Sequence, residues 1–317
     1  MTLKWMLRIG VLQVFITFFM ILLGGVVHNT GSSLACPDWP TCFGTFFPQM
    51  TGGVLIEHSH RILGMIIGIL CIIQLALGLK VRLEFKRIYL WSIGLLVLVI
   101  YQGILGGVTV LYQLPPQIST LHLGTAQLIF VAMISQAYRI YRVKKPLPKF
   151  SENLPSSRLL WITLLVVYLQ ILYGASVRHF GYSAGCGLGS DYSMLCMDLE
   201  NGGTVFWPSI GGSQFHMGHR LLGVLSALMV IASTIPLIIW AKRAKNQWIR
   251  LLAGSTHLIV IAQIIFGIWT LSSHIDTLPV SLHLAGATLL LGVVFFLAHY
   301  LSALKCAAKK GAQSNHA

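Results

Sequence analysis

Eight apolar segments, each long enough to cross a bilayer as a helix, restrict the fold of this chain more than any other feature. A helix needs about 20 residues to cross the hydrocarbon core, where its backbone polar groups must bond within the segment. The composition agrees, because 56% of the 317 residues are hydrophobic and 9% are charged. We therefore predict an all-α integral membrane protein with eight transmembrane helices. The segments are 5–27, 55–79, 88–111, 117–140, 159–178, 215–240, 249–272 and 278–304.

The distribution of positive charge predicts the orientation of these helices. The formal net charge is +14, but all but three of the 22 lysines and arginines lie near a terminus or between segments two and three, four and five, or six and seven. By the positive-inside rule, that face and both termini are cytoplasmic. Basic side chains on that face meet anionic lipid, so we predict no nucleic-acid partner. The exceptions, Arg61, Arg178 and Arg220, fall at the outer ends of segments.

Four histidines recur in the same order in the two halves of the chain. His219 follows His60 by 159 residues, and His283 follows His122 by 161. Each half contains an even number of segments, so the repeat is parallel. We predict two tandem four-helix bundles related by a pseudo-two-fold axis, in residues 1–145 and 158–317. A proline-rich cytoplasmic linker at 146–157 joins them.

The paired histidines of each half are predicted to share one depth near the outer face. Two facing imidazoles can hold one iron if their nitrogens lie roughly 4 Å apart. Zinc and copper sites usually use three or four protein ligands, whereas a bundle that supplies two has room for a flat macrocycle. We therefore predict haem iron as the metal, held by His60 with His122 and by His219 with His283.

One substitution between the halves suggests that the two sites differ. Glu57 precedes His60 by three residues and projects from the same helix face, whereas His216 holds that place in the second half. A carboxylate near the membrane interface is costly, which favours a reactive site in the first half and an electron-relay site in the second. Alternatively, backbone N–H groups at a helix start satisfy Glu57. Arg61 and Arg220 are candidates for haem propionates, or they reach lipid headgroups.

Two cysteine pairs lie in the two long outer loops. Cys36 and Cys42 are in the first loop, and Cys186 and Cys196 are in the second. Disulfides are expected on the oxidising side of the membrane. They are either structural bonds that close the loops over the histidine ends of the bundles, or redox-active pairs that pass electrons inward.

Taken together, these motifs resemble the haem A synthase family over nearly the whole chain. The residues that carry the resemblance are Gly24-Gly25, Thr30-Gly31, Cys36-Pro-Asp-Trp-Pro-x-Cys42, Glu57-x-x-His60-Arg61, Leu-His122-Leu-Gly, His219-Arg220 and Leu-His283-Leu. The resemblance implies an eight-span enzyme that oxidises the C8 methyl of haem O to the formyl of haem A for terminal oxidase assembly. It implies roles for the following residues: His60 and His122 would hold the substrate haem, His219 and His283 a haem b cofactor, Glu57 would be catalytic, and Cys36 and Cys42 would be a loop pair linked to activity.

The same resemblance sets the expected surroundings of the protein. With no transit peptide, a bacterial cell membrane is favoured over a mitochondrial one. A haem O synthase would supply the substrate, an unidentified donor would supply electrons, and a homo-oligomer is compatible with the sequence. The expected chemistry is successive hydroxylation of one methyl group to a geminal diol, which loses water to give the aldehyde.

Two other functions fit part of the sequence. A diheme b-type electron-transfer protein would need the four histidines but not Glu57. A membrane thiol-disulfide oxidoreductase would need the cysteines but not the histidines. A transporter is less well supported, because the histidine pattern is repeated and lies near one interface.

Overall fold

The computed structural model describes residues 1–145, 147–148, 154–191, 193–197 and 203–314, with side chains as far as residue 308. Of the predicted linker, residues 146 and 149–153 lie outside this part. Eight helices in the described part are long and apolar enough to cross a membrane, which confirms the predicted all-α membrane fold. They are α1 (Thr2–Asn29), α2 (Gly52–Lys80), α3 (Lys86–Leu111), α4 (Pro116–Lys144), α5 (Arg158–His179), α6 (Gly211–Arg243), α7 (Gln247–Ser272) and α8 (Thr277–Ser314).

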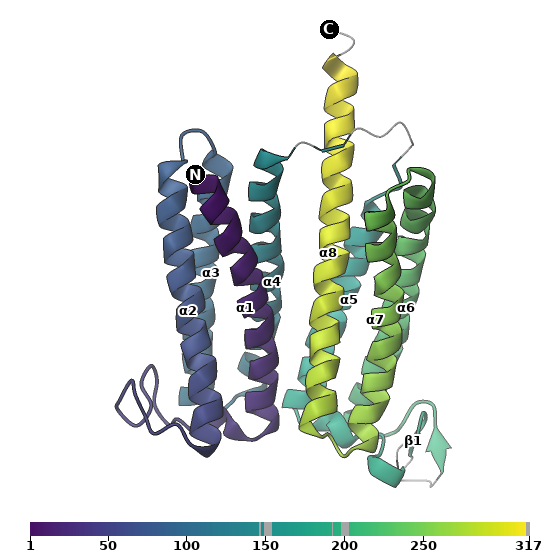
Figure 1. The fold of residues 1–317 in the computed structure, drawn as a ribbon. Coiled ribbons are helices and arrows are strands. Elements are labelled where there is room, and N and C mark those ends of the chain that lie inside the picture. Colours follow the sequence, from purple (N-terminus) through teal and green to yellow (C-terminus); the bar gives the residue numbers. More distant parts are fainter. Residues whose placement is uncertain (146, 149–153, 192, 198–202, 315–317) are drawn as a thin grey trace.

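The helices form two groups of four (Figure 1). Within the first group, α1 contacts α2 and α4, and α3 contacts the same two helices. Helices α5 to α8 repeat this closed ring, and α4, α5, α1 and α8 meet between the groups. Both termini lie at one end of the molecule, here called the terminal end. The connections from α1 to α2 and from α5 to α6 lie at the opposite end, here called the loop end.

Several helices extend beyond the predicted apolar segments. Helix α2 begins at Gly52 rather than 55, α6 begins at Gly211 rather than 215, and α8 continues to Ser314 rather than 304. Apolar residues mark only the part in hydrocarbon, whereas a helix continues into the polar interface where its side chains can be hydrophilic. The predicted boundaries therefore place the histidines too close to the helix starts.

The two loop-end connections begin with the same local structure. After α1 and after α5, a glycine takes up a left-handed conformation, at φ 67° for Gly31 and 78° for Gly181. This conformation is strained for a residue with a Cβ. A short 3-10 helix and then a cysteine follow in each case, so Cys36 and Cys186 hold equivalent places. The short 3-10 helices are η1 (Ser32–Leu34) and η2 (Tyr182–Ala184).

The second connection contains elements that the sequence did not predict. A further 3-10 turn, η3 (Gly189–Asp191), precedes two strands, β1 (Cys196–Met197) and β2 (Thr204–Val205), which pair antiparallel. Two-residue strands are too short for an alternating apolar pattern to reveal them.

Each group of helices buries its own apolar core. Ile67, Leu95 and Met133 pack together in the first group. Leu237 and Leu297 belong to a buried cluster in the second. Between the groups, the Gln127 amide donates to the Thr288 hydroxyl at 2.9 Å. Such a bond stabilises helix association by only about 0.6 kcal/mol in a membrane, so close packing dominates this contact.

Candidate functional site

The four predicted histidines lie at matching positions in their helices. His60 and His219 are each the ninth residue of their helix, in α2 and α6, and His122 and His283 are each the seventh, in α4 and α8. At a rise of about 1.5 Å per residue, all four lie roughly two turns from the loop end. Their common depth in the membrane stays a prediction.

The second pair has the spacing expected for two ligands of one iron. The ring centres of His219 and His283 are 6.5 Å apart, with an interplanar angle of 76°. Two imidazoles bound to one iron through bonds of ~2 Å have their centres about 6 Å apart. The His122 ring interacts electrostatically with His60, which places these two rings in the same region. The structure thus brings together both histidine pairs that the sequence predicted.

A glycine on the preceding helix faces each histidine ring. Because a side chain at these positions would crowd the rings, glycine allows each imidazole to lie close to the backbone of the preceding helix. An ideal Cβ would lie 3.1 Å from the His60 ring at Gly24, 3.2 Å from His122 at Gly106, 2.7 Å from His219 at Gly174 and 3.4 Å from His283 at Gly267.

Glutamine amides hold two of the rings in place. Gln170 Nε2 lies 3.1 Å from His219 Nδ1 and donates to the His219 carbonyl at 3.0 Å. Gln102 Nε2 lies 3.3 Å from His122 Nδ1 and donates to that residue's carbonyl at 2.9 Å. Contacts of this kind orient metal-ligating histidines, and their loss typically costs 10- to 100-fold in metal affinity.

These glutamines were not among the residues predicted from the sequence, although a simple spacing reveals them. A residue four positions before each of the facing glycines lies on the same helix face. That residue is a glutamine in three of the four helices and a methionine in α1. The pairs are Met20 with Gly24, Gln102 with Gly106, Gln170 with Gly174 and Gln263 with Gly267.

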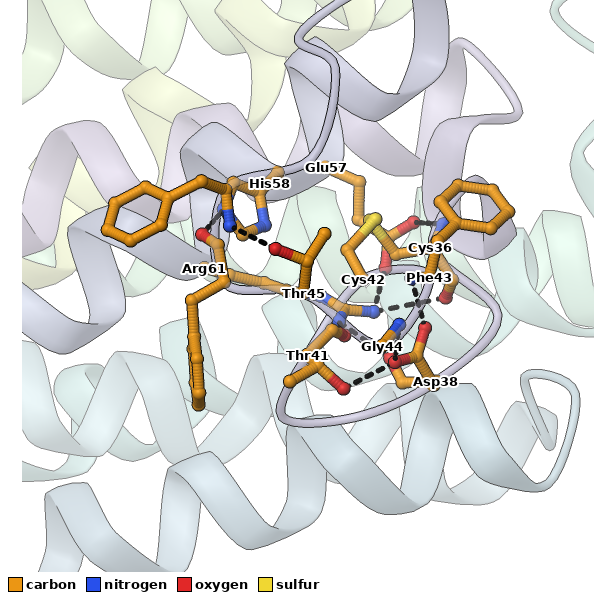
Figure 2. The surroundings of a disulfide bond; sticks show 12 residues. Cys36, Asp38, Thr41, Cys42, Phe43, Gly44, Thr45, Glu57, His58 and Arg61 are labelled. Carbon is orange, nitrogen blue, oxygen red and sulfur yellow. Dashed lines mark hydrogen bonds and ion pairs between the residues drawn. A yellow bond between two sulfur atoms is a disulfide. The ribbon is translucent and has the colours of Figure 1, made fainter.

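The Glu57 carboxylate joins the first disulfide loop to α2 (Figure 2). Glu57 Oε2 accepts a hydrogen bond from the Cys36 backbone N–H at 2.8 Å, and Oε1 pairs with Arg61 Nη2 at 2.5 Å. Both side chains are largely buried. The arginine partner and the backbone donor fix the position of this buried carboxylate. Its catalytic role stays a prediction.

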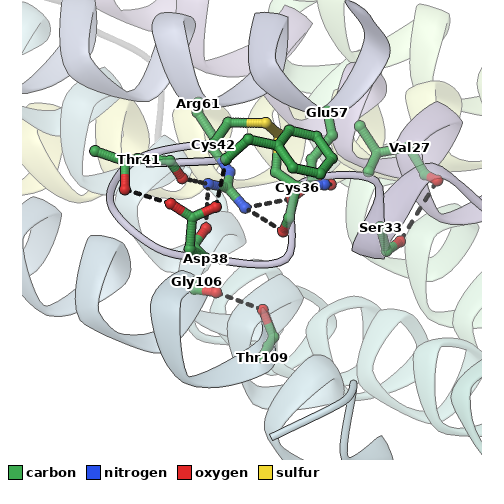
Figure 3. Close-up of polar contacts among 11 residues, drawn as sticks. Val27, Ser33, Cys36, Asp38, Thr41, Cys42, Glu57, Arg61, Gly106 and Thr109 are labelled. Atoms are coloured by element: carbon green, nitrogen blue, oxygen red, sulfur yellow. Dashed lines mark hydrogen bonds and ion pairs between the residues drawn. A yellow bond between two sulfur atoms is a disulfide. The ribbon is translucent and has the colours of Figure 1, made fainter. Parts of the chain in front are cut away.

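Arg61 holds the loop through its backbone carbonyls (Figure 3). Its guanidinium donates to the carbonyl oxygens of Asp38 at 2.7 Å, Thr41 at 2.6 Å and Cys36 at 3.1 Å. The Cys36–Cys42 disulfide closes the same loop. Three carbonyls and the Glu57 carboxylate therefore accept from most of the five N–H donors of Arg61. A contact between Arg61 and a haem propionate also stays a prediction.

Asp38 stabilises the turn inside this loop. The Thr41 hydroxyl and the N–H groups of Gly44 and Phe43 donate to its carboxylate. These hydrogen bonds, that from Thr41 above all, lower the pKa of Asp38 below its usual value. Asp38 is therefore a carboxylate at neutral pH. Its neighbour Trp39 lies against α3, where a Cβ at Gly107 would meet the indole at 2.7 Å.

The second loop, like the first, is held by an arginine and closed by a disulfide. Arg220 donates to the carbonyls of Ser193 at 2.9 Å and Met194 at 2.8 Å, and Cys186 and Cys196 form the second disulfide. The predicted propionate contact of Arg220 likewise stays a prediction.

The two disulfides have different neighbours on the following helix. Buried His58 lies beside Cys36 and Cys42, with a nitrogen within 4.8 Å of both sulfur atoms. In the second half, Met217 packs against Cys186 and Cys196 instead. Because both cysteines of the first pair are disulfide-bonded, that cluster offers no thiolate to a metal.

Comparison with known proteins places the chain in a family. It is 27% identical over 301 residues to haem A synthase of Staphylococcus saprophyticus, which covers 93% of this chain and 94% of that protein. Haem A synthase of Lysinibacillus sphaericus is 27% identical over 297 residues, with 88% and 89% covered. That of Symbiobacterium thermophilum is 26% identical over 289 residues, with 88% and 90% covered. Residues 7–295 match the cytochrome oxidase assembly protein family, and the chain therefore belongs to that family.

Proposed function

We propose that this protein is a haem A synthase, which oxidises the C8 methyl group of haem O to a formyl group. The observation that carries the proposal is the pair of matching histidine sites, of which only the first has a carboxylate beside it among the residues that the structure describes. Glu57 lies one turn from His60, and His216 replaces it beside His219. The relatives named haem A synthase support the same activity.

The residues present suit a haem in each half. His219 and His283 have the separation that two iron ligands need, and a glycine beside each of the four rings lets that ring lie close to the preceding helix. We assign haem b to the second pair, and haem O, the substrate, to His60 and His122. A haem with two histidine ligands supplies one-electron redox chemistry between its ferric and ferrous states.

Glu57 is the residue we assign to the chemistry. Two hydroxylations, each a two-electron oxidation of the methyl carbon that needs an external oxidant, would give a geminal diol, and the redox-neutral loss of water then leaves the formyl group. A fixed carboxylate near that carbon can stabilise positive charge that develops there, or move protons during the dehydration. The Arg61 and Cys36 contacts hold the carboxylate in position.

We assign residues 1–145 to the substrate unit and 158–317 to the haem b unit. Both disulfides lie at the loop end, and basic residues such as Lys80, Arg142 and Arg243 lie towards the other end, which supports an outer location for the loop end and cytoplasmic termini. The bacterial relatives favour the cell membrane of a bacterium. A haem O synthase and an electron donor would be functional partners, and a homo-oligomer is compatible with this arrangement.

The proposal is tested by co-expression with a haem O synthase in a host that makes no haem A. We expect mass analysis of the extracted haem to show haem A only when this chain is present. Haem O without haem A, together with two equivalent b-type haems on the purified protein, would instead indicate a diheme electron carrier, which the matched histidine positions also allow.

A further inference from the structure

A polar cluster fills the space between the two helix groups at the loop end. Arg178, in the last turn of α5, donates a hydrogen bond to the Asn29 side-chain oxygen at the end of α1. Asn29 Nδ2 in turn donates to the Ile275 carbonyl at 3.3 Å and to the Thr277 hydroxyl at 2.9 Å. Thr277 is the first residue of α8, so the guanidinium lies where α1, α5 and the start of α8 meet.

Two further histidines surround Arg178. The rings of His28 and His179 meet edge to face with centres 4.8 Å apart, and Arg178 is close enough to His28 for their charges to interact. The Thr120 hydroxyl lies 3.0 Å from His179 Nδ1. Thr120 precedes the iron-ligand candidate His122 by two residues, so α4 of the first group also borders this cluster.

The charge of Arg178 has no carboxylate partner among the residues described. Within that part of the chain, the one ion pair joins Glu57 to Arg61. Arg178 is partly buried, and a partly buried charge in a membrane protein normally faces an anion or a functional cavity. Its contact with Asn29 uses one donor of five and supplies no negative charge. The first turn of α8, which Asn29 contacts, also favours an anion through its backbone N–H groups.

The helix register places Arg178 next to the second histidine pair. Gln170, Gly174 and Arg178 follow one another at four-residue intervals on one face of α5. Gln170 contacts His219, and Gly174 lies against the same ring. Arg178 is therefore one turn, about 5 Å, further towards the loop end than the His219 contact. A flat group held between His219 and His283 would present its edge to this turn.

We propose that Arg178 binds a propionate carboxylate of the haem held by His219 and His283. The inference rests on the proposed function only for the identity of that haem. His28 and His179 add polar groups around the carboxylate, and the Asn29 contact keeps the guanidinium at the start of α8. Arg61 and Arg220 differ from Arg178, because their guanidinium groups donate to loop carbonyls.

The experiment compares protohaem IX with its dimethyl ester, which lacks the carboxylate charge. Full-length protein carrying His60→Ala is produced in a host that cannot make haem, so that the two-histidine spectrum reports on the second site alone. Each haem is titrated into this protein and into versions that also carry Arg178→Gln, Arg178→Lys or, as a matched control, Arg139→Gln. Arg139 stacks on Trp91 in the terminal half of α4, far along the helix from Thr120.

We expect the diacid to bind at least about 10-fold more tightly than the diester when Arg178 is present. Arg178→Gln should weaken diacid binding by about 10- to 100-fold and leave diester binding unchanged, so the preference disappears. Arg178→Lys should keep part of the preference, and Arg139→Gln all of it.

If Arg178→Gln weakens the binding of the diacid and the diester equally, the proposal is overturned and Arg178 is a packing residue. The proposal is also overturned if the variant affects the binding of neither haem. If the glutamine variant does not fold, Arg178→Lys decides the question. The proposal is contradicted if this variant prefers the diacid over the diester as strongly as the His60→Ala protein does. It is also contradicted if the preference is lost because diester binding is lost as well. Failure of the wild-type chain to convert haem O would overturn the proposed function and leave the ester comparison standing.

Discussion

Replacing His219 or His283 by alanine is expected to remove the low-spin b-type spectrum of the purified protein. The two rings face each other at a ring-centre distance of 6.5 Å, so loss of either one leaves a single axial ligand. An iron with one histidine ligand has an open coordination position and no longer gives the spectrum of a two-histidine site. Reduced-minus-oxidised visible spectra, with the haem quantified per mole of protein, measure the effect.

Matched variants in the first half serve as controls. His60→Ala and His122→Ala should retain the low-spin band, because the haem that they affect is the substrate. His257→Ala is a further control, since that ring lies deeper in α7 and contacts Thr234 at 2.8 Å. A full low-spin spectrum in both His219→Ala and His283→Ala would contradict the assignment of haem b to the second half.

Removal of the Glu57 charge is expected to lower haem A formation by about 100-fold or more while the low-spin spectrum remains. Glutamine and alanine separate two roles for this side chain. A glutamine oxygen can still accept from the Cys36 N–H, so a role limited to holding the loop predicts nearly normal activity for Glu57→Gln. A role for the negative charge predicts that Glu57→Gln and Glu57→Ala are similarly impaired.

Haem A per mole of protein, from cells that also make haem O, is the quantity to compare. Glu84→Gln provides a matched control, because Glu84 lies in the turn between α2 and α3 at the terminal end. Normal haem A production by Glu57→Gln would restrict Glu57 to the stabilisation of the disulfide loop.

The sequence predicted the membrane helices well because long apolar runs have few alternatives in a bilayer. It also predicted that His219 would meet His283, since both lie near the starts of helices that run in the same direction across the membrane. The contacts of Arg61 were not predictable. They depend on how the Cys36–Cys42 loop folds back over α2, and no periodic pattern describes that path.

Comparison of the two halves reveals features that neither half reveals alone. The four-residue spacing of Gln170 and Gly174 becomes informative only once Gly174 is seen against His219. The role of Arg178 was missed for a related reason, because its neighbours come from α1 and α8, at distances in sequence that a local reading does not connect. His58 beside the first disulfide and Met217 beside the second are a further divergence between otherwise equivalent places.

The central claim is that the two histidine pairs hold different haems, one the substrate and one the cofactor. The most direct measurement is the mass of the haems extracted from two purified double variants, both made in cells that produce haem O. We expect the His60→Ala, His122→Ala protein to contain haem b without haem O or haem A. The His219→Ala, His283→Ala protein should retain haem O and form no haem A. Haem A in the first variant, or haem b as the main haem of the second, would contradict the account.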